Sequence, residues 1–458
     1  MTGNSIDSQT HRAVAAVQRA TQLISQGRYR DARDYLSQAA ERLPDDPRVL
    51  DMAGHAWFVM GRYEQAWPLF ERAVALSPGE EMFLVHKAAC AVYVGKTEVA
   101  RSIYKSILKR NPRNRRIHYE LAQLGRARND EHVKQMLKAL RKGAPAENIF
   151  LYYALGKEYE DLERWDSAFE YYKQGGDAVK TVSRYNVTED VEVIDSIIDT
   201  CSDEWLRDGG ATRVTEPTPI FVVGLPRTGT TLTDRILSSH SQIESAGESQ
   251  LLQMVLRGGT RAGNEVGITP AQIKAAARRD PTATARDFLA AVRHRLGDAP
   301  YFIEKLPENV LYLGFVAKSW PDAKIVHLRR HPMDACFAMY KQSYFRFAYS
   351  LDDLAEYYLA YDRLSRHWRG VLGNRVVEIH YEGLVSDQEN QTRRLLDRLG
   401  FEFEEACLHF DRNVAPVATA SSVQVREKVH TRSVEKWKKF AAHLKPLEKR
   451  LRAGGVEF

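Results

Sequence analysis

The sequence predicts two kinds of fold in one chain: an α-helical repeat superhelix, followed by an α/β domain with a parallel central sheet. In the first part, glycine, alanine and proline each recur every 34 residues, which is typical of stacked helix pairs. In the second part, short apolar runs alternate with helical segments, as strands covered on both faces do. We expect the repeat array over residues 12–175, a helical linker over 176–217 and the α/β domain over 218–458.

The composition is that of a globular protein without extreme charge. Of 458 residues, 44% are hydrophobic and 28% charged, and the net charge of +6 comes from clustered basic segments, so it does not imply nucleic-acid binding. The four cysteines are widely scattered, which argues against a zinc site or a disulfide framework. Residues 1–9 are polar and no run approaches the roughly 20 apolar residues of a membrane span, so we expect a cytoplasmic protein without a transmembrane segment.

The repeat array is indicated by three sets of residues that share one period. They are Gly27, Gly61 and Gly95; Ala32, Ala66 and Ala100; and Pro44, Pro78 and Pro112. A glycine in the turn between two helices, an alanine where helices pack closely and a proline at the end of the second helix explain the three sets. The pattern resembles the tetratricopeptide repeat (TPR), and this resemblance implies a superhelix with a concave face.

The period weakens after residue 113. Lys134 stands where alanine is expected, while Ala168 returns to the register with Glu163 in place of the turn glycine. We therefore expect four to five repeats that end near Gln174. Such an array binds a peptide or partner in its groove, or serves as a spacer or dimerisation arm, and the sequence does not choose between these functions.

Residues 219–231 form the stretch around which the second part is organised. Residues 220–223 predict a buried strand, and a helix begins at Thr230. Between them, Gly224 and Gly229 let the backbone turn tightly and bring its N–H groups close to an anion, next to the positive end of the helix dipole. The stretch therefore predicts a phosphate-binding loop at the carboxyl end of a strand.

This loop is P-loop-like, with one informative difference. Residues 224–231 match the glycine spacing of nucleotide triphosphatases, but Thr230 stands where those proteins have lysine. Arg227 supplies a fixed charge suited to phosphate or sulfate oxygens instead. The pattern favours a nucleotide with an anionic 5′ group, bound without a metal. The alternative is a glycine–proline turn of the kind found in any α/β protein.

Two further strands are expected to end in basic residues. Residues 301–303 lead to Lys305, and residues 324–328 lead to Arg329 and Arg330, where a triphosphatase places a metal-binding aspartate. Ligands of parallel sheets bind beyond the carboxyl ends of the strands. A lysine there can hold a bridging oxygen, and paired arginines predict a second anion clamp. The alternative for Lys305 is a surface lysine.

One acidic residue is expected at the same edge. Glu248 follows the loop helix by about one helix and one loop, a return that places it at the carboxyl edge of the sheet. A carboxylate beside an anionic leaving group is suited to general-base work. The alternative is an acid near the N-terminus of the helix that follows. A fourth strand is expected over residues 376–382.

Taken together, these motifs resemble the sulfotransferase family. They are residues 223–231, 246–248, 304–307 and 330–334, in the family's order and spacing. Over about residues 12–450 the chain is similar to bacterial sulfotransferases with N-terminal TPRs, and its catalytic half is similar to tyrosylprotein sulfotransferases. The resemblance implies an α/β sulfotransferase domain that moves a sulfuryl group from 3′-phosphoadenylyl sulfate (PAPS) to an acceptor hydroxyl, with no metal.

The resemblance also implies which residues bind the two ends of PAPS. The 5′-phosphosulfate would be bound by Arg227, Thr228, Gly229, Thr230 and Thr231. Arg330 would bind the 3′-phosphate. The family usually has a serine eight residues after this arginine, where this chain has Ala338, and Lys341, Gln342 or Ser343 could replace that contact.

The remaining roles follow from the same resemblance. Glu248 would be the catalytic base, although Ser249 follows it where tyrosine-specific enzymes have a second glutamate that is the base. Lys305 and Arg227 would stabilise the transferring sulfuryl group, and Tyr381 would lie near the adenine. The segment expected to fold over the nucleotide contributes Ser421, Ser422 and Lys436.

We expect the acceptor to be a peptide tyrosine, which the TPR groove could present, or a glycan, a lipid or a small phenol, and nothing in the residues chooses among them. Two other functions stay open. A P-loop kinase is disfavoured by Thr230 and by Arg329 and Arg330. A non-catalytic TPR scaffold with a degenerate nucleotide-binding domain is favoured by Ala338 and Ser249.

Overall fold

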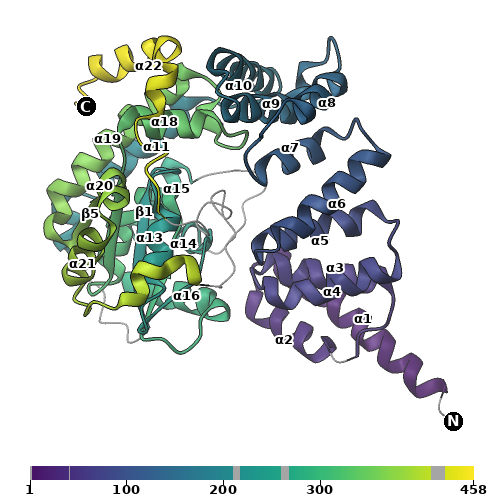
Figure 1. Ribbon diagram of the computed structural model, residues 1–458. Coiled ribbons are helices and arrows are strands. Elements are labelled where there is room, and N and C mark those ends of the chain that lie inside the picture. Colours follow the sequence, from purple (N-terminus) through teal and green to yellow (C-terminus); the bar gives the residue numbers. More distant parts are fainter. Residues whose placement is uncertain (1–2, 41, 210–216, 259–267, 414–428) are drawn as a thin grey trace.

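The computed structural model describes residues 3–40, 42–209, 217–258, 268–413 and 429–458, arranged as a helical array beside an α/β domain (Figure 1). In that view the α/β domain is on the left and the array on the right, and the N-terminus lies at the lower end of the array. Among the described residues, no helix combines the length and apolar character needed to cross a bilayer.

The array consists of antiparallel helix pairs. They are α1 (Gly3–Ser25) with α2 (Tyr29–Ala40), α3 (Pro47–Val59) with α4 (Tyr63–Leu76), α5 (Glu81–Tyr93) with α6 (Thr97–Arg110), α7 (Arg115–Gln123) with α8 (Glu131–Ala139), and α9 (Ile149–Asp161) with α10 (Trp165–Lys180). The predicted helical repeats are therefore confirmed, and α10 continues five residues beyond residue 175.

The turns within the pairs show why glycine marks the period. Gly27, Gly61 and Gly95 have φ angles of 76°, 77° and 81°, a left-handed conformation that costs glycine little. Glu163 adopts the same conformation, with φ of 60°, in the turn between α9 and α10. The last pair therefore keeps the geometry of the earlier turns although its sequence has lost the glycine.

The apolar spacing over residues 191–205 would predict a single helix, but the linker differs from this. Two helices are present, α11 (Val187–Thr200) and α12 (Asp203–Arg207). The break falls at Ser202, whose hydroxyl accepts a hydrogen bond of 3.2 Å from the backbone N–H of Trp205. That prediction was wrong because the serine caps the start of a new helix.

The α/β domain contains a five-stranded parallel sheet in the order β2-β3-β1-β4-β5. The strands are β1 (Thr218–Gly224), β2 (Ile243–Ser245), β3 (Tyr301–Glu304), β4 (Lys324–Arg329) and β5 (Val376–His380). Strand β2 was not predicted, because three residues carry no recognisable pattern. Strand β5 is shorter than the expected 376–382, because Tyr381 begins helix α20 (Tyr381–Ser386).

Helices cover both faces of this sheet, as the apolar runs predicted. The larger ones are α13 (Thr230–Leu237), α14 (Leu251–Leu256), α15 (Pro270–Ala276), α16 (Pro281–Val292), α17 (Leu313–Ser319), α18 (Pro332–Tyr340), α19 (Leu351–Leu372), α21 (Gln388–Leu399) and α22 (Ala441–Ala453). Along β1, Phe221 and Val223 enter one apolar cluster while Ile220 and Val222 enter another. Successive side chains of a strand point to opposite faces, so both faces are buried.

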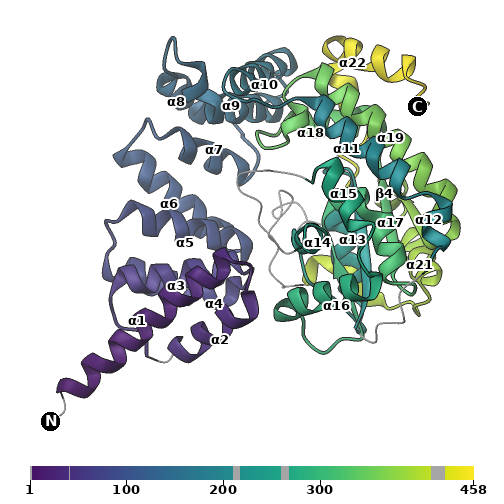
Figure 2. The same cartoon turned by 180° about the vertical axis from the view of Figure 1, so that it is seen from behind.

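The array contacts the α/β domain at both of its ends. The last pair shares one apolar core with that domain, and Phe169 of α10 stacks on Tyr340 of α18 with ring centroids 5.8 Å apart. At the other end, Tyr29 stacks on His294 in the short helix η2 (Arg293–Arg295), with centroids 5.0 Å apart. Both views show α9 and α10 beside α18 and α22, while the earlier pairs run alongside the domain (Figures 1 and 2). The array therefore spans the α/β domain.

The junction with the last pair predicts a position-specific effect of Gly176→Ala. A methyl group at Gly176 of α10 would overlap the backbone carbonyl oxygen of Tyr349. Overpacking typically costs about 1–3 kcal/mol. That is more than the stabilisation of about 1 kcal/mol that alanine brings to a helix. We expect a lower free energy of unfolding in urea.

The control is Gly79→Ala, where an added methyl group would have no neighbour within 4 Å. Equal urea midpoints for the two variants would contradict the close approach of α10 to the α/β domain.

Candidate functional site

The loop between β1 and α13 has the backbone of an anion-binding turn. Gly224, Arg227 and Gly229 have φ angles of 151°, 67° and 100°. Residues of positive φ within such a turn help successive N–H groups to converge, which is how such loops bind anions. The Thr228 hydroxyl closes the turn by donating to the carbonyl of Leu225 over 2.7 Å. The predicted phosphate-binding loop therefore has the required local geometry.

The two glycines of the loop are required by their neighbours. A Cβ at Gly224 would lie 2.5 Å from the carbonyl oxygen of Leu328 in β4. A Cβ at Gly229 would lie 2.7 Å from Cδ2 of Tyr381. The loop thus lies against the ends of β4 and β5, where Tyr381 packs on Gly229.

Arg330 contacts both the loop and Tyr381. Its Nη1 donates to the carbonyl of Arg227 over 2.8 Å, and its Nη2 donates to the carbonyl of Ser433 over 2.5 Å. The guanidinium lies over the Tyr381 ring, 4.7 Å from its centroid, and its buried Nε has no hydrogen-bond partner. Burial lowers the pKa of Arg330. The structure therefore brings Arg227, Arg330 and Tyr381 together.

Glu248 and Lys305 meet at the ends of the two strands on the other side of β1. Glu248 follows β2 and Lys305 follows β3, and the backbone N–H of Lys305 donates to the carbonyl of Gly247 over 3.2 Å. The Lys305 ammonium contacts the Glu248 carboxylate directly. The Lys305 side chain is fully buried, whereas that of Glu248 is 31% exposed. Solvent or an acceptor can therefore reach the Glu248 carboxylate, but not the Lys305 ammonium.

Ser249, which follows Glu248, has a separate role. It is buried and donates to Oε1 of Glu304 over 2.7 Å. Glu304 has no exposed surface, and its burial raises its pKa to about 7, against the opposing effect of the Ser249 hydrogen bond. Ser249 thus supports a buried carboxyl group beneath the Glu248–Lys305 pair.

Arg295 is a site residue that sequence reasoning missed. Its Nη1 donates to the carbonyls of Ala246 and Glu248 over 3.1 and 3.2 Å. A Cβ at Gly61, in the turn between α3 and α4, would lie 3.4 Å from the same Nη1. Arg295 therefore fixes the backbone of the Glu248 segment and is covered by the array. No sequence pattern could have found it, because it depends on a contact between two domains.

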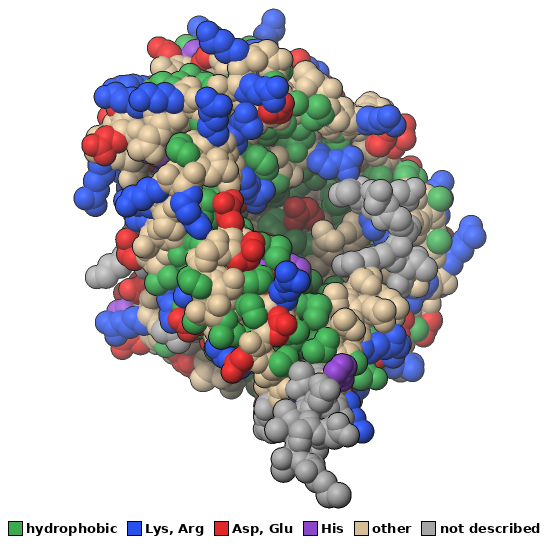
Figure 3. All heavy atoms as spheres, turned by 90° about the vertical axis from the view of Figure 1, so that its right-hand side faces the viewer, with side chains coloured by type: hydrophobic (Ala, Val, Ile, Leu, Met, Phe, Trp, Pro, Cys, Tyr) green, Lys and Arg blue, Asp and Glu red, His purple; other side chains and the backbone are tan. Residues whose placement is uncertain are grey.

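The array also lies close to the Glu248 carboxylate. Burial raises the pKa of Tyr63 and Tyr93, and the Glu248 charge contributes to the shift of both phenols. The two rings pack together with centroids 5.0 Å apart. Seen from the array's side, the surface is hollowed near its centre, and hydrophobic and acidic side chains are visible in the hollow (Figure 3). Aromatic residues of the second and third repeats therefore face the site.

Lys436 makes a contact that the sequence did not predict. Its ammonium contacts Glu160 of α9, a carboxylate that also binds Lys341 over 2.8 Å. Ser343, another candidate for the 3′-phosphate, lies 3.5 Å from the hydroxyl of Tyr119. Ser421 and Ser422 lie outside the described residues. The basic side chains near α18 are therefore tied to the array, and Glu160 is a second residue that the sequence did not reveal.

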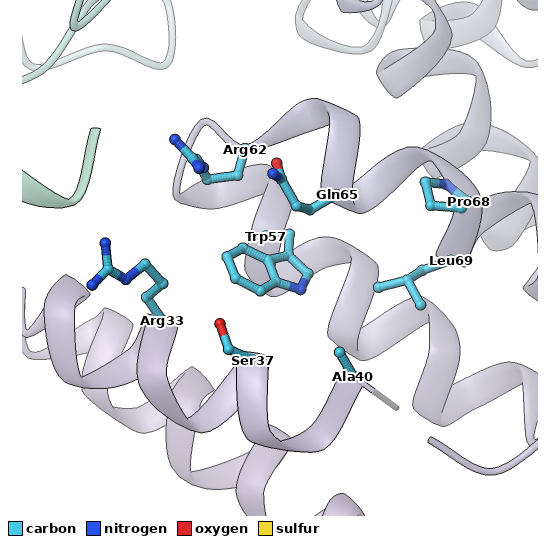
Figure 4. Close-up of a pocket in the computed structure, with 8 residues that line it drawn as sticks. All are labelled: Arg33, Ser37, Ala40, Trp57, Arg62, Gln65, Pro68 and Leu69. Carbon is cyan, nitrogen blue, oxygen red and sulfur yellow. The ribbon is translucent and has the colours of Figure 1, made fainter. Parts of the chain in front are cut away.

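Two pockets open on the array and contain none of the predicted site residues. The first, of about 440 Å³, is lined by Arg33, Ser37, Ala40, Trp57, Arg62, Gln65, Pro68 and Leu69. Figure 4 shows Arg33 and Arg62 at one end of it and Pro68 and Leu69 at the other. The second pocket, of about 740 Å³, is lined by Glu98, Arg101, Lys105, Gly125, Arg126, Ala127 and Arg128. Across the described ranges, no group of three or more His, Cys, Asp or Glu side chains could hold a metal ion.

Two known protein families match parts of the chain. Residues 219–405 match the model of the sulfotransferase family, and residues 17–81 and 91–146 match the tetratricopeptide repeat. The first match spans β1 to β5 and includes the loop, Glu248, Lys305 and Arg330. Residues 219–405 are therefore similar to the sulfotransferase family, and the helical array that precedes them is similar to TPRs.

Several known proteins are similar to this chain over part or most of its length. An uncharacterised protein of Aquifex aeolicus is 26% identical over 444 residues, which are 94% of this chain and 54% of that protein. A putative protein-tyrosine sulfotransferase of Caenorhabditis briggsae and protein-tyrosine sulfotransferase 1 of Danio rerio are each 24% identical over 48% of this chain, and 80% and 65% of their own lengths are covered. The chain thus spans about half the length of the Aquifex relative.

Solved structures with a similar fold include sulfotransferase domains. The domain from the olefin synthase of Synechococcus PCC 7002 is 21% identical with a TM-score of 0.41, covering 55% of this chain and all of that domain. The domain from the curacin biosynthetic pathway is 16% identical with a TM-score of 0.37, covering 52% of this chain and 99% of that domain.

The buried Glu304 predicts how stability depends on pH. Because its pKa is raised to about 7 in the folded protein, its neutral form is favoured there. The contribution of the neutral carboxyl group to the free energy of unfolding is therefore complete below the ordinary pKa of glutamate. It is lost as the pH rises through 7, because the buried group must then ionise. The loss amounts to at most about 3 kcal/mol. Urea unfolding between pH 5 and pH 8 measures this slope.

Glu304→Gln is the matched variant, because it keeps the shape and cannot ionise. Its unfolding free energy should fall less steeply with pH than that of the wild type. Parallel curves for the two proteins would contradict the burial of an ionisable carboxyl group at this position.

Proposed function

We propose that the protein is a PAPS-dependent sulfotransferase. The observation that carries this proposal is the contact of Arg330 with the backbone of the β1–α13 loop, beside Arg227. Two anion-binding elements at adjacent strand ends suit a nucleotide with phosphates on both sides of its ribose. The family match gives the class of transferase.

The donor would be bound by residues from three strand ends. Residues 227–231 and the start of α13 would hold the 5′-phosphosulfate, through backbone N–H groups and the helix dipole. Arg330 would bind the 3′-phosphate, with its unpartnered Nε as a further donor. Tyr381, which supports both the loop and Arg330, would lie against the adenosine. Ser421, Ser422 and Lys436 would complete the cover over the nucleotide.

The chemical step would take place at the Glu248–Lys305 pair. Glu248 takes the proton of the acceptor hydroxyl while the oxygen of that hydroxyl attacks the sulfur of the donor. The bond between this sulfur and the bridging oxygen of the donor breaks. Lys305 and Arg227 stabilise the negative charge that develops on that bridging oxygen and on the sulfuryl group. A buried ammonium is effective in this role, because the surrounding low dielectric strengthens its field.

The acceptor would be a hydroxyl of a peptide tyrosine, a glycan or a phenol. We propose that the TPR array forms part of the surface that receives it or a partner protein. The proximity of Tyr63 and Tyr93 to Glu248 supports this role, since these rings come from the second and third repeats. We further propose a cytoplasmic location, in keeping with four buried cysteines that form no disulfide.

The role of Lys305 is tested by Lys305→Met, which removes the charge and keeps an apolar stem. Because the charge acts on the transition state, we expect turnover with labelled PAPS to fall by about 100- to 1,000-fold. The affinity for 3′,5′-adenosine bisphosphate should stay within about threefold of wild type, because Lys305 lies beside Glu248 and not beside Arg330.

The assay offers labelled PAPS with pools of tyrosyl peptides, glycans and phenols, and calorimetry gives the affinity. Glu248→Gln serves as the second variant and should lose about 100- to 10,000-fold in turnover. Equal sulfation by wild type and Lys305→Met would refute the assigned role of Lys305. Absence of transfer by the wild type to every pool would leave the proposed function without support.

A further inference from the structure

Glu160 of α9 makes an unusual set of contacts for a repeat residue. Its carboxylate binds the ammonium groups of Lys341, over 2.8 Å, and of Lys436. The hydroxyl of Tyr172 donates to its other oxygen over 2.9 Å. Only 6% of the Glu160 side chain is exposed, whereas those of Lys341 and Lys436 are 17% and 34% exposed. A buried acid of the last repeat therefore binds two lysines of the sulfotransferase domain.

Both lysines lie on elements that also position Arg330. Lys341 is the residue after α18, and α18 begins two residues after Arg330. Lys436 begins the short helix η8 (Lys436–Phe440). The carboxylate of Asp334, in the first turn of α18, accepts hydrogen bonds from the backbone N–H groups on either side of Lys436, over 2.6 and 2.9 Å. Three residues before Lys436, the carbonyl of Ser433 accepts from Arg330.

The charges around this cluster are unbalanced. Lys341 faces Glu160, Lys436 and Arg227, and the contacts of the Glu160 carboxylate among the described residues are with the two lysines and the Tyr172 hydroxyl. Two ammonium groups held together in a poorly solvated place repel each other and lose hydration, and one carboxylate offsets only part of that cost. The remaining positive charge, next to Arg227, is available to an anion.

The last repeat is also part of the same hydrophobic core as α18 and η8. Trp165 of α10 packs on Phe440 of η8 with ring centroids 5.5 Å apart, and Phe169 stacks on His443 at 4.4 Å. The contact of Glu160 with the lysines is therefore built on a packed junction and does not depend on a pair of surface side chains.

We propose that Glu160 is a positioning residue of the donor site: from the TPR array it holds Lys341 and Lys436 in place and charged for a phosphate of the nucleotide. The proposal rests on the proposed function. It means that the last repeat completes the donor site and is not a separable partner-binding module. Any partner that displaces α9 then changes the affinity for the nucleotide, and the nucleotide changes the affinity for that partner by the same factor.

The ionisation of Lys341 provides a readout that a purely structural role would not give. Burial is the largest cause that lowers its pKa, to about 8, while Glu160 acts in the opposite direction. The affinity for 3′,5′-adenosine bisphosphate should therefore be constant just above pH 7 and should fall as the pH rises through 8, by up to about tenfold per pH unit. Both phosphates are already doubly ionised in this range, because their second pKa is about 6.

The decisive variant is Glu160→Gln, studied by calorimetry between pH 7 and pH 9.5. Without the carboxylate, the pKa of Lys341 should fall by a further one to three pH units, approximately. The onset of the fall in affinity near pH 8, called the break below, should then disappear from the measured range. Glu158→Gln is the matched control. Glu158 is a buried acid of the same helix, but it pairs with His132 and not with the two lysines. It should keep the break.

The possible results separate this inference from the proposed function. Absence of binding by the wild type removes both. Binding without a break near pH 8, or a break that persists in Glu160→Gln, overturns the role of Glu160 alone. A uniform loss of affinity at every pH, with the break retained, means that Glu160 only stabilises the fold and also overturns the proposal.

Should Glu160→Gln not fold, Glu160→Asp replaces it, since aspartate keeps the charge but withdraws it by one methylene. The weaker attraction should move the break to lower pH, and a break that stays at the wild-type pH overturns the proposal.

Discussion

The parallel order of the five strands is the constraint on which the candidate site depends. Each strand ends at the same edge of the sheet, and each is followed there by a part of the candidate site: Glu248 after β2, Lys305 after β3, the loop after β1, Arg330 after β4 and Tyr381 after β5. The sheet thus brings together five short motifs that are spread over residues 225–381 of the sequence. The contacts of Lys305 with Glu248, and of Arg330 with the loop, follow from this order.

Much of this domain was predictable from the sequence, because local patterns determine it. Apolar runs indicated four of the strands, and the glycines of the loop indicated its left-handed backbone. Strand β2 was not predictable, since its three residues are defined by pairing with β3 and not by their own pattern. The break at Ser202 was missed because one capping hydroxyl outweighed a helical periodicity.

The residues that could not be predicted are those that act between domains. Arg295 and Glu160 carry no motif, and their importance appears only when the array is placed against the sulfotransferase domain. They lie at opposite ends of the array's contact. Arg295, covered by the turn at Gly61, fixes the backbone of the proposed base, while Glu160 binds lysines beside the proposed donor site. The repeats are therefore adjacent to both halves of the proposed chemistry.

The central claim is that Arg330 binds one phosphate of a doubly phosphorylated adenosine. Its neighbour Arg329 offers a matched comparison, because the Arg329 guanidinium forms ion pairs with Asp362 and Glu378, each at 3.9 Å. The most direct measurement is calorimetric titration of 3′,5′-adenosine bisphosphate into wild type, Arg330→Met and Arg329→Met. We expect the affinity to fall by about 10- to 100-fold in Arg330→Met, because charge-assisted hydrogen bonds are lost. The affinity should change little in Arg329→Met, and equal affinities for all three proteins would contradict a phosphate-binding role of Arg330.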